Sequence, residues 1–542
     1  MKSVGFGKKI NNKIKDFQIR ERCENHNYIN AAYKAREWIY RNTIHHKGIV
    51  ITNKQRQIYQ EVTGYYIPTL LQWGMRDLAI EYASYLCEIQ QPNGAWLNFN
   101  ETLESVFNTG QVLRGLLAIS DIYPCAKEHL IKGCEWLVSN MNDEGRLVAI
   151  EGTIWSDNGF NTELIHLYCL PPLRDTGLKY GIIKYIDATD RILNYYKKEY
   201  IDDILNFNYL SHFYAYVLEA LYDLGETRIV KMAMKKIERM QRPDGAVPAL
   251  KNCKWVCSTG LFQLAIVWFK MGDFKHGDKA FDYAVKLQNK SGGWYGGYSA
   301  KFNLPLGKSI EYATNEKITY FDNEEISWAV KYFFDAMYYR SKCEFEYKAH
   351  TFMNCIDSQD EKYLAVVNEI SKINKAFEAI KIVDIGCGKG RYLKKLYINN
   401  PKNEYWGIDI SQEVLKYIRS PKINTKTGSI LYTGFDSDTF DFVYATESLE
   451  HAVFIDLAIK EMVRITKPGG VIVIIDKEAE SFELVKYCDW IDPAELSTKQ
   501  WLNTSDVEKI FNNSDISNFR AYYLPTNEVK MYKAYIGRKN YE

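Results

Sequence analysis

The chain has 542 residues, of which 46% are hydrophobic and 25% charged, and its formal net charge is +1. A single hydrophobic core stops growing at roughly 250 to 300 residues, so we expect two or three folded domains. The composition excludes a disordered or fibrous protein. The balanced charge argues against a nucleic-acid-binding protein, whose affinity usually depends on a basic excess.

Residues 1–30 are predicted to be a basic amino-terminal tail. The segment lacks the apolar stretch of about seven to fifteen residues that a secretory signal needs, and weak contact with an anionic membrane is the alternative. No run approaches roughly eighteen apolar residues, so no transmembrane segment is expected. The eleven cysteines lack zinc-ligand spacing, which predicts reduced thiols, no metal site and a cytoplasmic location.

Residues 31–340 are predicted to form an all-α domain of helical hairpin repeats. A turn phrase recurs as QQPNGAW at 90–96, QRPDGAV at 241–247 and QNKSGGW at 288–294, with a degenerate copy at 141–145. The spacing is close to multiples of about fifty residues, and such a period is typical of repeat architectures. The expected helices that follow these turns or lie between them are 109–118, 162–170, 211–222, 258–271 and 325–337. Several such hairpins side by side predict a closed α/α toroid.

The repeated phrase is interpreted as structural. Its glutamine can bond the loop backbone, its glycine permits a positive φ, and its tryptophan can cover the end of the hairpin. The domain resembles the helical toroids of the prenyltransferase and squalene-cyclase-like group, which carry Gln-x-x-x-Gly-x-Trp repeats, and those of several glycan lyases and unsaturated-uronide hydrolases. The Asp-x-Asp-Asp acid of the cyclases is missing, since the nearest acidic pair is Asp202 and Asp203. Triterpene cyclisation is therefore not expected.

A sugar-binding cavity is predicted at the mouth of this toroid. Aromatic rings can stack on a sugar while carboxylates accept bonds from its hydroxyls, and paired carboxylates could also hydrolyse a glycoside. The alternative is that each of these side chains lies on a solvated or satisfied helix face. The candidate lining residues are Glu61, Glu163, His212, Tyr214 and Glu325.

Residues 341–542 are predicted to form an α/β domain of Rossmann-like fold. Strands alternate with helices, which indicates a parallel sheet, and two final strands suggest a hairpin. The segment 347–375 is expected to supply the leading helices of this domain. The predicted strands are 381–385, 405–410, 440–445, 471–476, 520–524 and 532–538.

The sequence DIGCGKG at 384–390 lies between a predicted strand and helix, which is the context that a glycine-rich ligand loop requires. Glycines let the backbone approach a ligand, and the following helix offers free N–H groups. Dinucleotide-binding folds prefer Gly-x-Gly-x-x-Gly, whereas this loop is Gly-x-Gly-x-Gly. Asp409 ends the next strand, where a carboxylate can bind both hydroxyls of a ribose.

The combination resembles the class I S-adenosylmethionine-dependent methyltransferases of the Leu-Glu-His type. The resemblance implies that 384–390 surrounds the methionine part of the cofactor, that 409–410 binds ribose and adenine, and that 428–430 forms the adenine edge. Many members have Asp where this chain has Ser429, which puts the contact to the adenine amino group in doubt. The implied cofactor-binding residues are Asp384, Gly386, Cys387, Gly388, Gly390, Asp409, Ile410, Ser429, Ile430 and Ala445.

Three residues that follow the predicted strand 440–445 are the candidate catalytic groups: Glu447, Glu450 and His451. Methyl transfer mainly requires positioning of the acceptor and removal of one proton. An unperturbed histidine has a pKa near 6.5, so a residue of the type of His451 suits a base. The alternative is that Glu450 and His451 only hold the loop. Lys389 and Arg391 are expected to be solvated.

The pairing of a toroid with a methyltransferase suggests an enzyme that O-methylates a sugar in bacterial surface-polysaccharide or glycoconjugate synthesis, with a carbohydrate or glycolipid as substrate. One alternative is an isoprenoid or other lipid acceptor, and another is a toroid that only docks partner proteins. An apolar cavity lining would favour the lipid, and aromatic groups with carboxylates would favour the sugar. The sequence predicts no oligomeric state.

Overall fold

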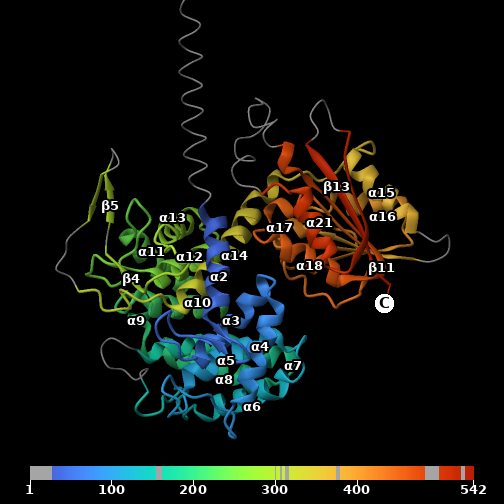
Figure 1. The fold of residues 1–542 in the computed structure, drawn as a ribbon. Coiled ribbons are helices and arrows are strands. Elements are labelled where there is room, and N and C mark those ends of the chain that lie inside the picture. Colours follow the sequence, from blue (N-terminus) through green and yellow to red (C-terminus); the bar gives the residue numbers. More distant parts are fainter. Residues whose placement is uncertain are drawn as a thin grey trace, which may run out of the picture. The chain divides into compact units, whose positions relative to one another are not determined.

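The computed structural model describes residues 27–153, 162–299, 301–304, 308–311, 317–373, 379–481, 500–525 and 531–541, so most of the predicted tail lies outside the described residues. Contacts divide the chain into two compact units, which Figure 1 colours along the sequence. One comprises Ala31–Leu71 and Met75–Cys343, and the other comprises the residues from Glu344 on together with Gln72–Gly74 and the residues before Ala31. The division falls inside a continuous helix, α14 (Ser327–Lys348). Among the described residues, no helix combines the length and the apolar character needed to cross a bilayer.

The first unit consists of helices with three pairs of short antiparallel strands. Its other helices are α2 (Asn27–Asn42), α3 (Gln60–Gln72), α4 (Arg76–Glu88), α5 (Val106–Ile119), α6 (Ala126–Ser139), η1 (Glu163–Cys169), α7 (Leu170–Tyr180), α8 (Ile183–Glu199), α9 (Ile201–Leu205), α10 (Ser211–Asp223), α11 (Thr227–Met240), α12 (Ser258–Lys270) and α13 (Phe274–Val285). The strand pairs are β1 (Thr43–Ile44) with β2 (Gly48–Ile49), β3 (Val256–Cys257) with β4 (Gly297–Tyr298), and β5 (Lys301–Leu304) with β6 (Lys308–Glu311).

Four of the five helices predicted from the repeat pattern are confirmed as α5, α10, α12 and α14. The fifth, expected at 162–170, is wrong in type, because the segment forms the 3₁₀ helix η1. Pro171 and Pro172 follow it at the start of α7. Proline has no N–H to donate, so the preceding carbonyls lose α-helical partners and the helix restarts.

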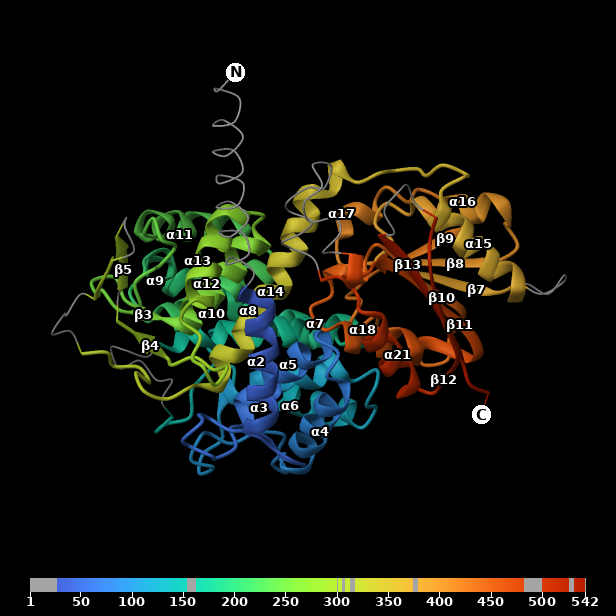
Figure 2. The ribbon, with the colours of Figure 1, turned by 45° about the horizontal axis from the view of Figure 1, so that its top comes forward.

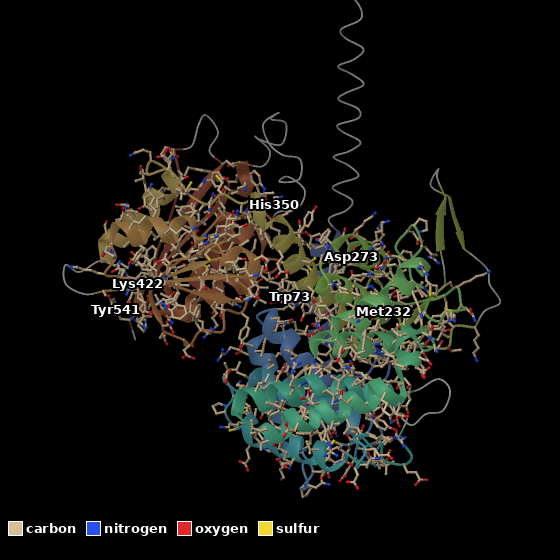
Figure 3. The ribbon with its side chains drawn as sticks, turned by 180° about the vertical axis from the view of Figure 1, so that it is seen from behind. Trp73, Met232, Asp273, His350, Lys422 and Tyr541 are labelled. Carbon is tan, nitrogen blue, oxygen red and sulfur yellow. The ribbon has the colours of Figure 1, made fainter. Side chains whose placement is uncertain are left out.

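Burial separates two kinds of helix in this unit. In α10 and α12 nearly every residue is buried, which is typical of a helix surrounded by others. In α11 only Val230, Ala233, Met234 and Ile237 are buried, a single stripe at helical spacing. Met232, on another face of α11, is 49% exposed and stands out from the helix in Figure 3. The helices α10 and α12 therefore occupy inner positions, and α11 occupies an outer one.

The helices α3, α5, η1, α10, α12 and α14 contact one another in sequence. The last of them also meets the first, because the Thr69 hydroxyl of α3 donates to Asp335 of α14 over 2.6 Å. The hydroxyl of Tyr66 donates to the carbonyl of Ser327 over 2.7 Å. These two bonds join elements more than 250 residues apart in the chain.

The repeated turns have the structural role that their sequence predicts. The side-chain amide of Gln241 donates to the carbonyl of Gly245, within its own turn, and to that of His276 in α13. Gln90 and Gln288 make the equivalent pairs of bonds. Trp294 is fully buried, and its indole N–H donates to a carbonyl of the preceding helix. Each turn thus ties one hairpin to the next.

Gly245→Ala should destabilise the first unit much more than Gly272→Ala. Both glycines have positive φ, +98° and +79°, so an alanine costs about 1–2 kcal/mol of backbone strain at either position. At Gly245 a Cβ would also lie 2.0 Å from the carbonyl oxygen of Lys279, whereas at Gly272 nothing lies within 4 Å. We expect a further loss of about 1–3 kcal/mol at Gly245. Thermal melting of the two variants measures this, and equal melting temperatures would contradict it.

The second unit is built on a seven-stranded sheet in the order β12-β13-β11-β10-β7-β8-β9. Six strands run in the same direction, and β13 is antiparallel to both of its neighbours, β11 and β12. The strands are β7 (Lys381–Ile385), β8 (Glu404–Asp409), β9 (Ile423–Thr427), β10 (Phe440–Thr446), β11 (Thr466–Lys477), β12 (Ile516–Tyr523) and β13 (Tyr532–Lys539). All six predicted strands and the terminal hairpin are confirmed. The strand β9 was missed because it is a polar edge strand with one buried residue.

Helices cover both faces of this sheet. They are α15 (Glu361–Ile373), α16 (Arg391–Asn399), α17 (Gln412–Leu415), α18 (Ile455–Ile465) and α21 (Thr504–Asn512), with short 3₁₀ helices η2 (Ala349–Thr351) and η3 (Leu449–His451). Residues of α15 and α16 share one apolar core with the sheet. Figure 2 shows α18 and α21 beyond the opposite face. This three-layer arrangement places the carboxyl ends of β7, β8 and β10 at one edge.

Candidate functional site

The predicted ligand loop joins the end of β7 to the start of α16. The N–H groups of Gly386 and Cys387 both donate to the carbonyl of Ile408 over 2.9 Å, which holds the loop against β8. Gly388 has φ of +52°, and a Cβ built there would meet nothing within 4 Å. The backbone of Gly388 is therefore open on the side where a side chain would stand. Such an exposed backbone suits close approach by a ligand.

Asp409 ends β8 and is hydrogen-bonded to the loop. One of its carboxylate oxygens accepts from the N–H of Gly388 and the other from the N–H of Ser411, both over 2.9 Å. Burial raises the pKa of Asp409, and these backbone donors partly oppose the rise. A carboxylate has about four acceptor positions, so capacity remains for the hydroxyls of a ribose.

Asp384 lies near the end of β7 and is 2% exposed. Burial raises the pKa of its carboxyl to about 7, and the neighbouring Tyr444 hydroxyl partly opposes this. Oxygen Oδ2 of Asp384 and the hydroxyl of Thr446 are buried without hydrogen-bond partners among the described residues. Tyr444 is the strand partner of Asp384 in β10. Such unpaired atoms at adjacent strand ends fit a polar ligand such as the amino end of S-adenosylmethionine.

The remaining cofactor-binding candidates lie around this loop in different ways. The thiol of Cys387 packs inward against Gly407, and burial raises its pKa, so only its backbone faces the loop side. Ala445 is buried within β10. Ser429 accepts from the N–H of Leu431 over 3.1 Å. Ile430 lies 3.8 Å from the position of a Cβ on Gly386, which places the segment after β9 beside the loop.

Ile410 directly follows Asp409, and its N–H bonds the Asp409 carboxylate. Its side chain is partly exposed. The side chain of Ile410 thus offers an apolar surface at this strand end, beside the Asp409 carboxylate.

Glu447 follows β10 with a φ of +53°. Its carboxylate pairs with Arg391 and with Lys362, at 3.6 Å from the ammonium, and accepts from the Tyr532 hydroxyl over 2.8 Å. Although burial alone would raise its pKa, the two cations and the phenol lower it to about 2. A carboxylate with so low a pKa is a poor proton acceptor, so its geometry favours holding the loop.

Glu450 is engaged in a buried charge cluster. Its carboxylate lies 2.7 Å from the ammonium of Lys477, and both side chains are 1% exposed. Its backbone N–H donates to Asp476, whose pKa is raised to about 8 by burial and by Glu450. The end of β11 therefore anchors the segment that carries η3.

His451 is the most accessible of the three catalytic candidates, with a side chain that is 32% exposed. Its Nε2 lies 3.6 Å from the Glu450 carboxylate, and its ring meets that of Phe345 edge-on at 5.0 Å. An imidazole held on two sides and open on another suits proton transfer better than the buried carboxylates do.

Sequence reasoning missed the cations of this site. Lys389 and Arg391 were expected to be solvated, and this is wrong. Lys389 is 6% exposed with its ammonium 4.2 Å from the centre of the Tyr417 ring, and Arg391 pairs with Glu447. Lys362 and Lys477 lie in no sequence motif that would have marked them as part of the site. Their partners are distant in the chain, so only the tertiary structure reveals them.

Two of the predicted sugar-binding residues, Glu61 and His212, belong to one buried cluster in the first unit. Both lie near Tyr216: the His212 and Tyr216 ring centroids are 4.6 Å apart with the rings tilted, and Glu61 contributes to the raised pKa of Tyr216. Glu61 is 4% exposed and His212 3%. They therefore remain candidates for a common site.

The other three predicted sugar-binding residues have partners of their own elsewhere. Glu163 forms a two-oxygen ion pair with Arg146. Glu325 accepts from the Trp38 indole over 2.8 Å and binds Asn289. The Tyr214 hydroxyl donates to the carbonyl of Ile204 over 2.8 Å. These contacts favour the alternative that they are satisfied structural residues.

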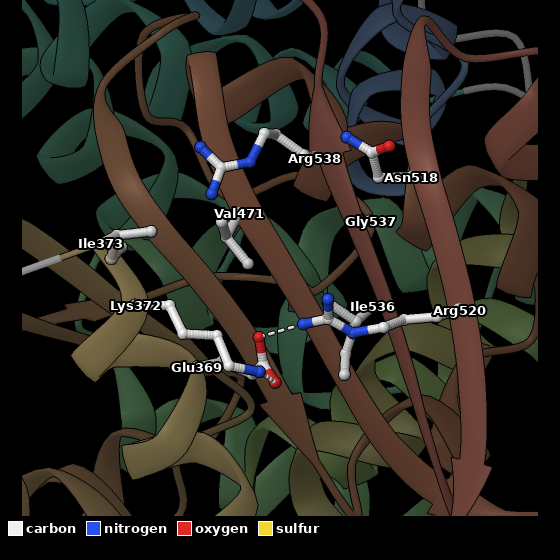
Figure 4. A pocket seen from close by; sticks show the side chains of 9 residues that line it. All are labelled: Glu369, Lys372, Ile373, Val471, Asn518, Arg520, Ile536, Gly537 and Arg538. Atoms are coloured by element: carbon white, nitrogen blue, oxygen red, sulfur yellow. Dashed lines mark hydrogen bonds and ion pairs between the residues drawn. The ribbon is translucent and has the colours of Figure 1, made fainter.

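A separate pocket of about 350 Å³ lies between α15 and the sheet (Figure 4). Glu369, which is 3% exposed, pairs there with Lys372 and Arg520. The pocket reaches Val471 near the start of β11, whereas the glycine loop follows the carboxyl end of β7. It is therefore not part of the cofactor site.

Comparisons with known proteins concern the second unit. Residues 383–474 match the family described as "Methyltransferase domain". The sterol 24-C-methyltransferase of Debaryomyces hansenii is 29% identical over 101 residues, which cover 17% of this chain and 27% of that protein. The demethylmenaquinone methyltransferase of Staphylococcus aureus is 23% identical over 189 residues, 30% of this chain and 78% of that protein. The chain thus spans about a quarter of the first curated relative.

Among solved structures, the magnesium protoporphyrin IX methyltransferase of Synechocystis PCC 6803 is similar at 12% identity and a TM-score of 0.30, covering 37% of this chain and 98% of that one. The family match spans β7, the glycine loop and Asp409, which are the elements that build the site. Residues 383–474 of the second unit are therefore an S-adenosylmethionine-dependent methyltransferase domain.

Proposed function

We propose that the protein transfers a methyl group from S-adenosylmethionine to a hydrophobic, isoprenoid- or sterol-like acceptor. The observation that carries the transfer is the arrangement of Asp384 and Asp409 at neighbouring strand ends, with the open backbone of Gly388 bonded to Asp409. When bound there, the cofactor supplies an activated methyl group on its sulfonium.

Asp409 would bind the ribose hydroxyls, because its carboxylate is fixed by Gly388 and Ser411 and keeps free acceptor positions. Asp384 would bind the amino end of the cofactor with its unpaired Oδ2. Ser429 and Ile430, in the segment beside the loop, would face the adenine. Because Ser429 has no carboxylate, the adenine amino group would rely on backbone acceptors.

His451 is proposed to accept the proton that the methyl acceptor loses. Glu450 positions it, because the Glu450 carboxylate is fixed by Lys477 and lies 3.6 Å from the imidazole. Glu447 positions the same segment through Arg391. These roles place one proton acceptor in a loop that is held at both ends.

The lipid acceptor is supported by the relatives of the methyltransferase domain. Several are named as sterol 24-C-methyltransferases and one as a demethylmenaquinone methyltransferase. These names favour a lipid over the sugar that was the first expectation. The resemblance covers the methyltransferase domain alone, so we propose only the chemical class of the acceptor and no single compound.

A sugar acceptor is kept as the second candidate because of the first unit. Its inner cluster joins tyrosines to a carboxyl and an imidazole, which is the lining expected for a sugar. We propose that this unit is the α/α toroid of the sequence prediction. The support is that six inner segments meet in order and that α14 bonds back to α3.

Labelled S-adenosylmethionine offered with competing acceptors tests the function. The full chain would be incubated with sterols, with demethylmenaquinone and with nucleotide-sugars, and label would be followed into each fraction. We expect label in the lipid fraction, and its loss by at least about a hundredfold in His451→Ala, since general base catalysis contributes roughly 10²–10⁴. Label confined to the sugars would establish the second candidate. Label in neither fraction would overturn both.

A further inference from the structure

Several buried polar atoms of the helical unit have no hydrogen-bond partner among the described residues. They are Glu61 Oε2, His166 Nδ1, the Ser211 and Tyr216 hydroxyls, Thr259 Oγ1, Gln263 Nε2 and Trp268 Nε1. Leaving such a group unsatisfied costs about 1–3 kcal/mol each. Native proteins keep few of these groups, so a local concentration of them requires an explanation.

Apart from Trp268 Nε1, which lies near the end of α12, these atoms lie in the first half or at the middle of four inner segments: α3, η1, α10 and α12. The segments α10 and α12 run in the same direction, because a Cβ on Gly260 would meet Ser211 while Tyr222 bonds Lys270 farther along both helices. In α3 and α14, Tyr66 meets Ser327 and Thr69 meets Asp335, again in parallel order. Parallel helices bring their amino-terminal ends to the same end of the unit.

Direct contacts show that several of these side chains form one cluster. The Nδ1 of His212 lies 2.5 Å from Oε1 of Gln263, which leaves the amide nitrogen of Gln263 as an unpaired donor. The His212 ring is 6.1 Å from those of Tyr320 and Tyr332. Tyr59, which bonds Glu61, and Tyr320 are the partly exposed members. The cluster therefore reaches the surface through two tyrosines.

The cluster is polar but carries no net charge near neutral pH. Burial raises the pKa of Glu61 to about 8, against the opposing bond from Tyr59, so the carboxyl keeps its proton. Burial lowers the pKa of both His166 and His212 to about 3, so both imidazoles are neutral. The nearby ammonium of Lys331 is balanced by Asp335 at 2.6 Å. A buried site without net charge disfavours phosphates and carboxylates, because their charge would be left unpaired.

We propose that the amino-terminal ends of α3, η1, α10 and α12 bind a neutral sugar. Glu61 and Gln263 donate hydrogen bonds to its hydroxyl oxygens, and the Tyr216 and His212 rings pack against its apolar face. The ligand satisfies atoms that the protein alone leaves unpaired. The inference concerns the helical unit and does not rest on the identity of the methyl acceptor.

Saturation-transfer NMR on the full chain tests this site with defined probes. The neutral probes are the methyl glycosides of glucose, galactose, mannose and N-acetylglucosamine, and the charged ones are glucuronate and glucose 1-phosphate. We expect at least one neutral glycoside to bind and both charged probes to fail. Absence of binding by every neutral glycoside at tens of millimolar, or equal binding of the charged probes, overturns the proposal.

Two variants of Glu61 separate a proton donor from a carboxylate acceptor. Glu61→Ala should weaken binding of that glycoside about tenfold or more, because a donor is lost. Glu61→Gln keeps a donor and should stay within about threefold. Binding to the unchanged protein should also fall as the pH rises through about 8, because Glu61 then loses its proton. Binding to E61Q should not change over the same pH range. The other titratable groups that face Glu61 are Tyr59, Tyr65, Cys169, Tyr216 and Tyr320. Unchanged binding by E61A, or loss in E61Q equal to that in E61A, overturns the role of Glu61.

A matched pair on α10 controls for folding. Tyr216→Phe removes a hydroxyl inside the cluster, whereas Tyr214→Phe removes one that bonds the Ile204 carbonyl elsewhere. We expect weaker binding only in Y216F, with melting temperatures of the variants measured in parallel. Equal weakening by Y214F would show that the effect is structural and would overturn the assignment.

Discussion

Asp409→Ala should weaken the binding of S-adenosylmethionine by about a hundredfold or more. Hydrogen bonds to a charged group are worth about 1.5–3 kcal/mol each, and two ribose hydroxyls would lose theirs. The variant also removes the acceptor that fixes the N–H of Gly388, so the loop loses an anchor at its most open residue. Isothermal titration of the full chain measures the change.

His451→Ala is the matched control for this experiment. It should leave cofactor affinity within about threefold while abolishing most of the transfer, because His451 is placed on the acceptor side. A loss of cofactor affinity in H451A comparable to that in D409A would contradict this division of roles. So would an unchanged affinity in D409A.

Lys477→Met should destabilise the methyltransferase unit by about 3–5 kcal/mol. The ammonium of Lys477 is 1% exposed and lies 2.7 Å from Glu450, and removal of one partner leaves the other charge buried and uncompensated. Asp476, already raised to a pKa of about 8 by burial and by Glu450, would lose the cation that opposes this rise. The measurement is the urea transition that shifts when S-adenosylmethionine is added.

The double variant Glu450→Gln with Lys477→Met should recover most of the lost stability, because it leaves neither member of the ion pair buried without its partner. The defect of K477M alone should also shrink as the pH falls. Its buried carboxyls would have raised pKa values, so the folded state would bind more protons than the unfolded state and gain stability in acid. A defect that is equal at low and high pH would contradict the charge explanation.

Local patterns determined much of both units. The repeated turns were readable because Gln, Gly and Trp act within a few residues of one another, as the bonds of Gln241 and Trp294 show. The methyltransferase strands were readable because each is apolar and bounded by turn residues. The exceptions were η1, where prolines interrupt a helical pattern, and β9, whose polar edge position leaves no apolar signal.

The sequence by itself determined the loop at 384–390 and its partner Asp409, because backbone freedom and strand-end position are local properties. Only the tertiary structure decided which charges meet. In the folded protein Glu447 pairs with Arg391 and Lys362, and Glu450 pairs with Lys477. The tertiary structure also left one carboxyl oxygen of Glu61 without a hydrogen-bond partner among the described residues and raised the pKa of that group, whereas Glu163 pairs with Arg146. Burial and long-range pairing set these protonation states, and neither has a signature in neighbouring residues.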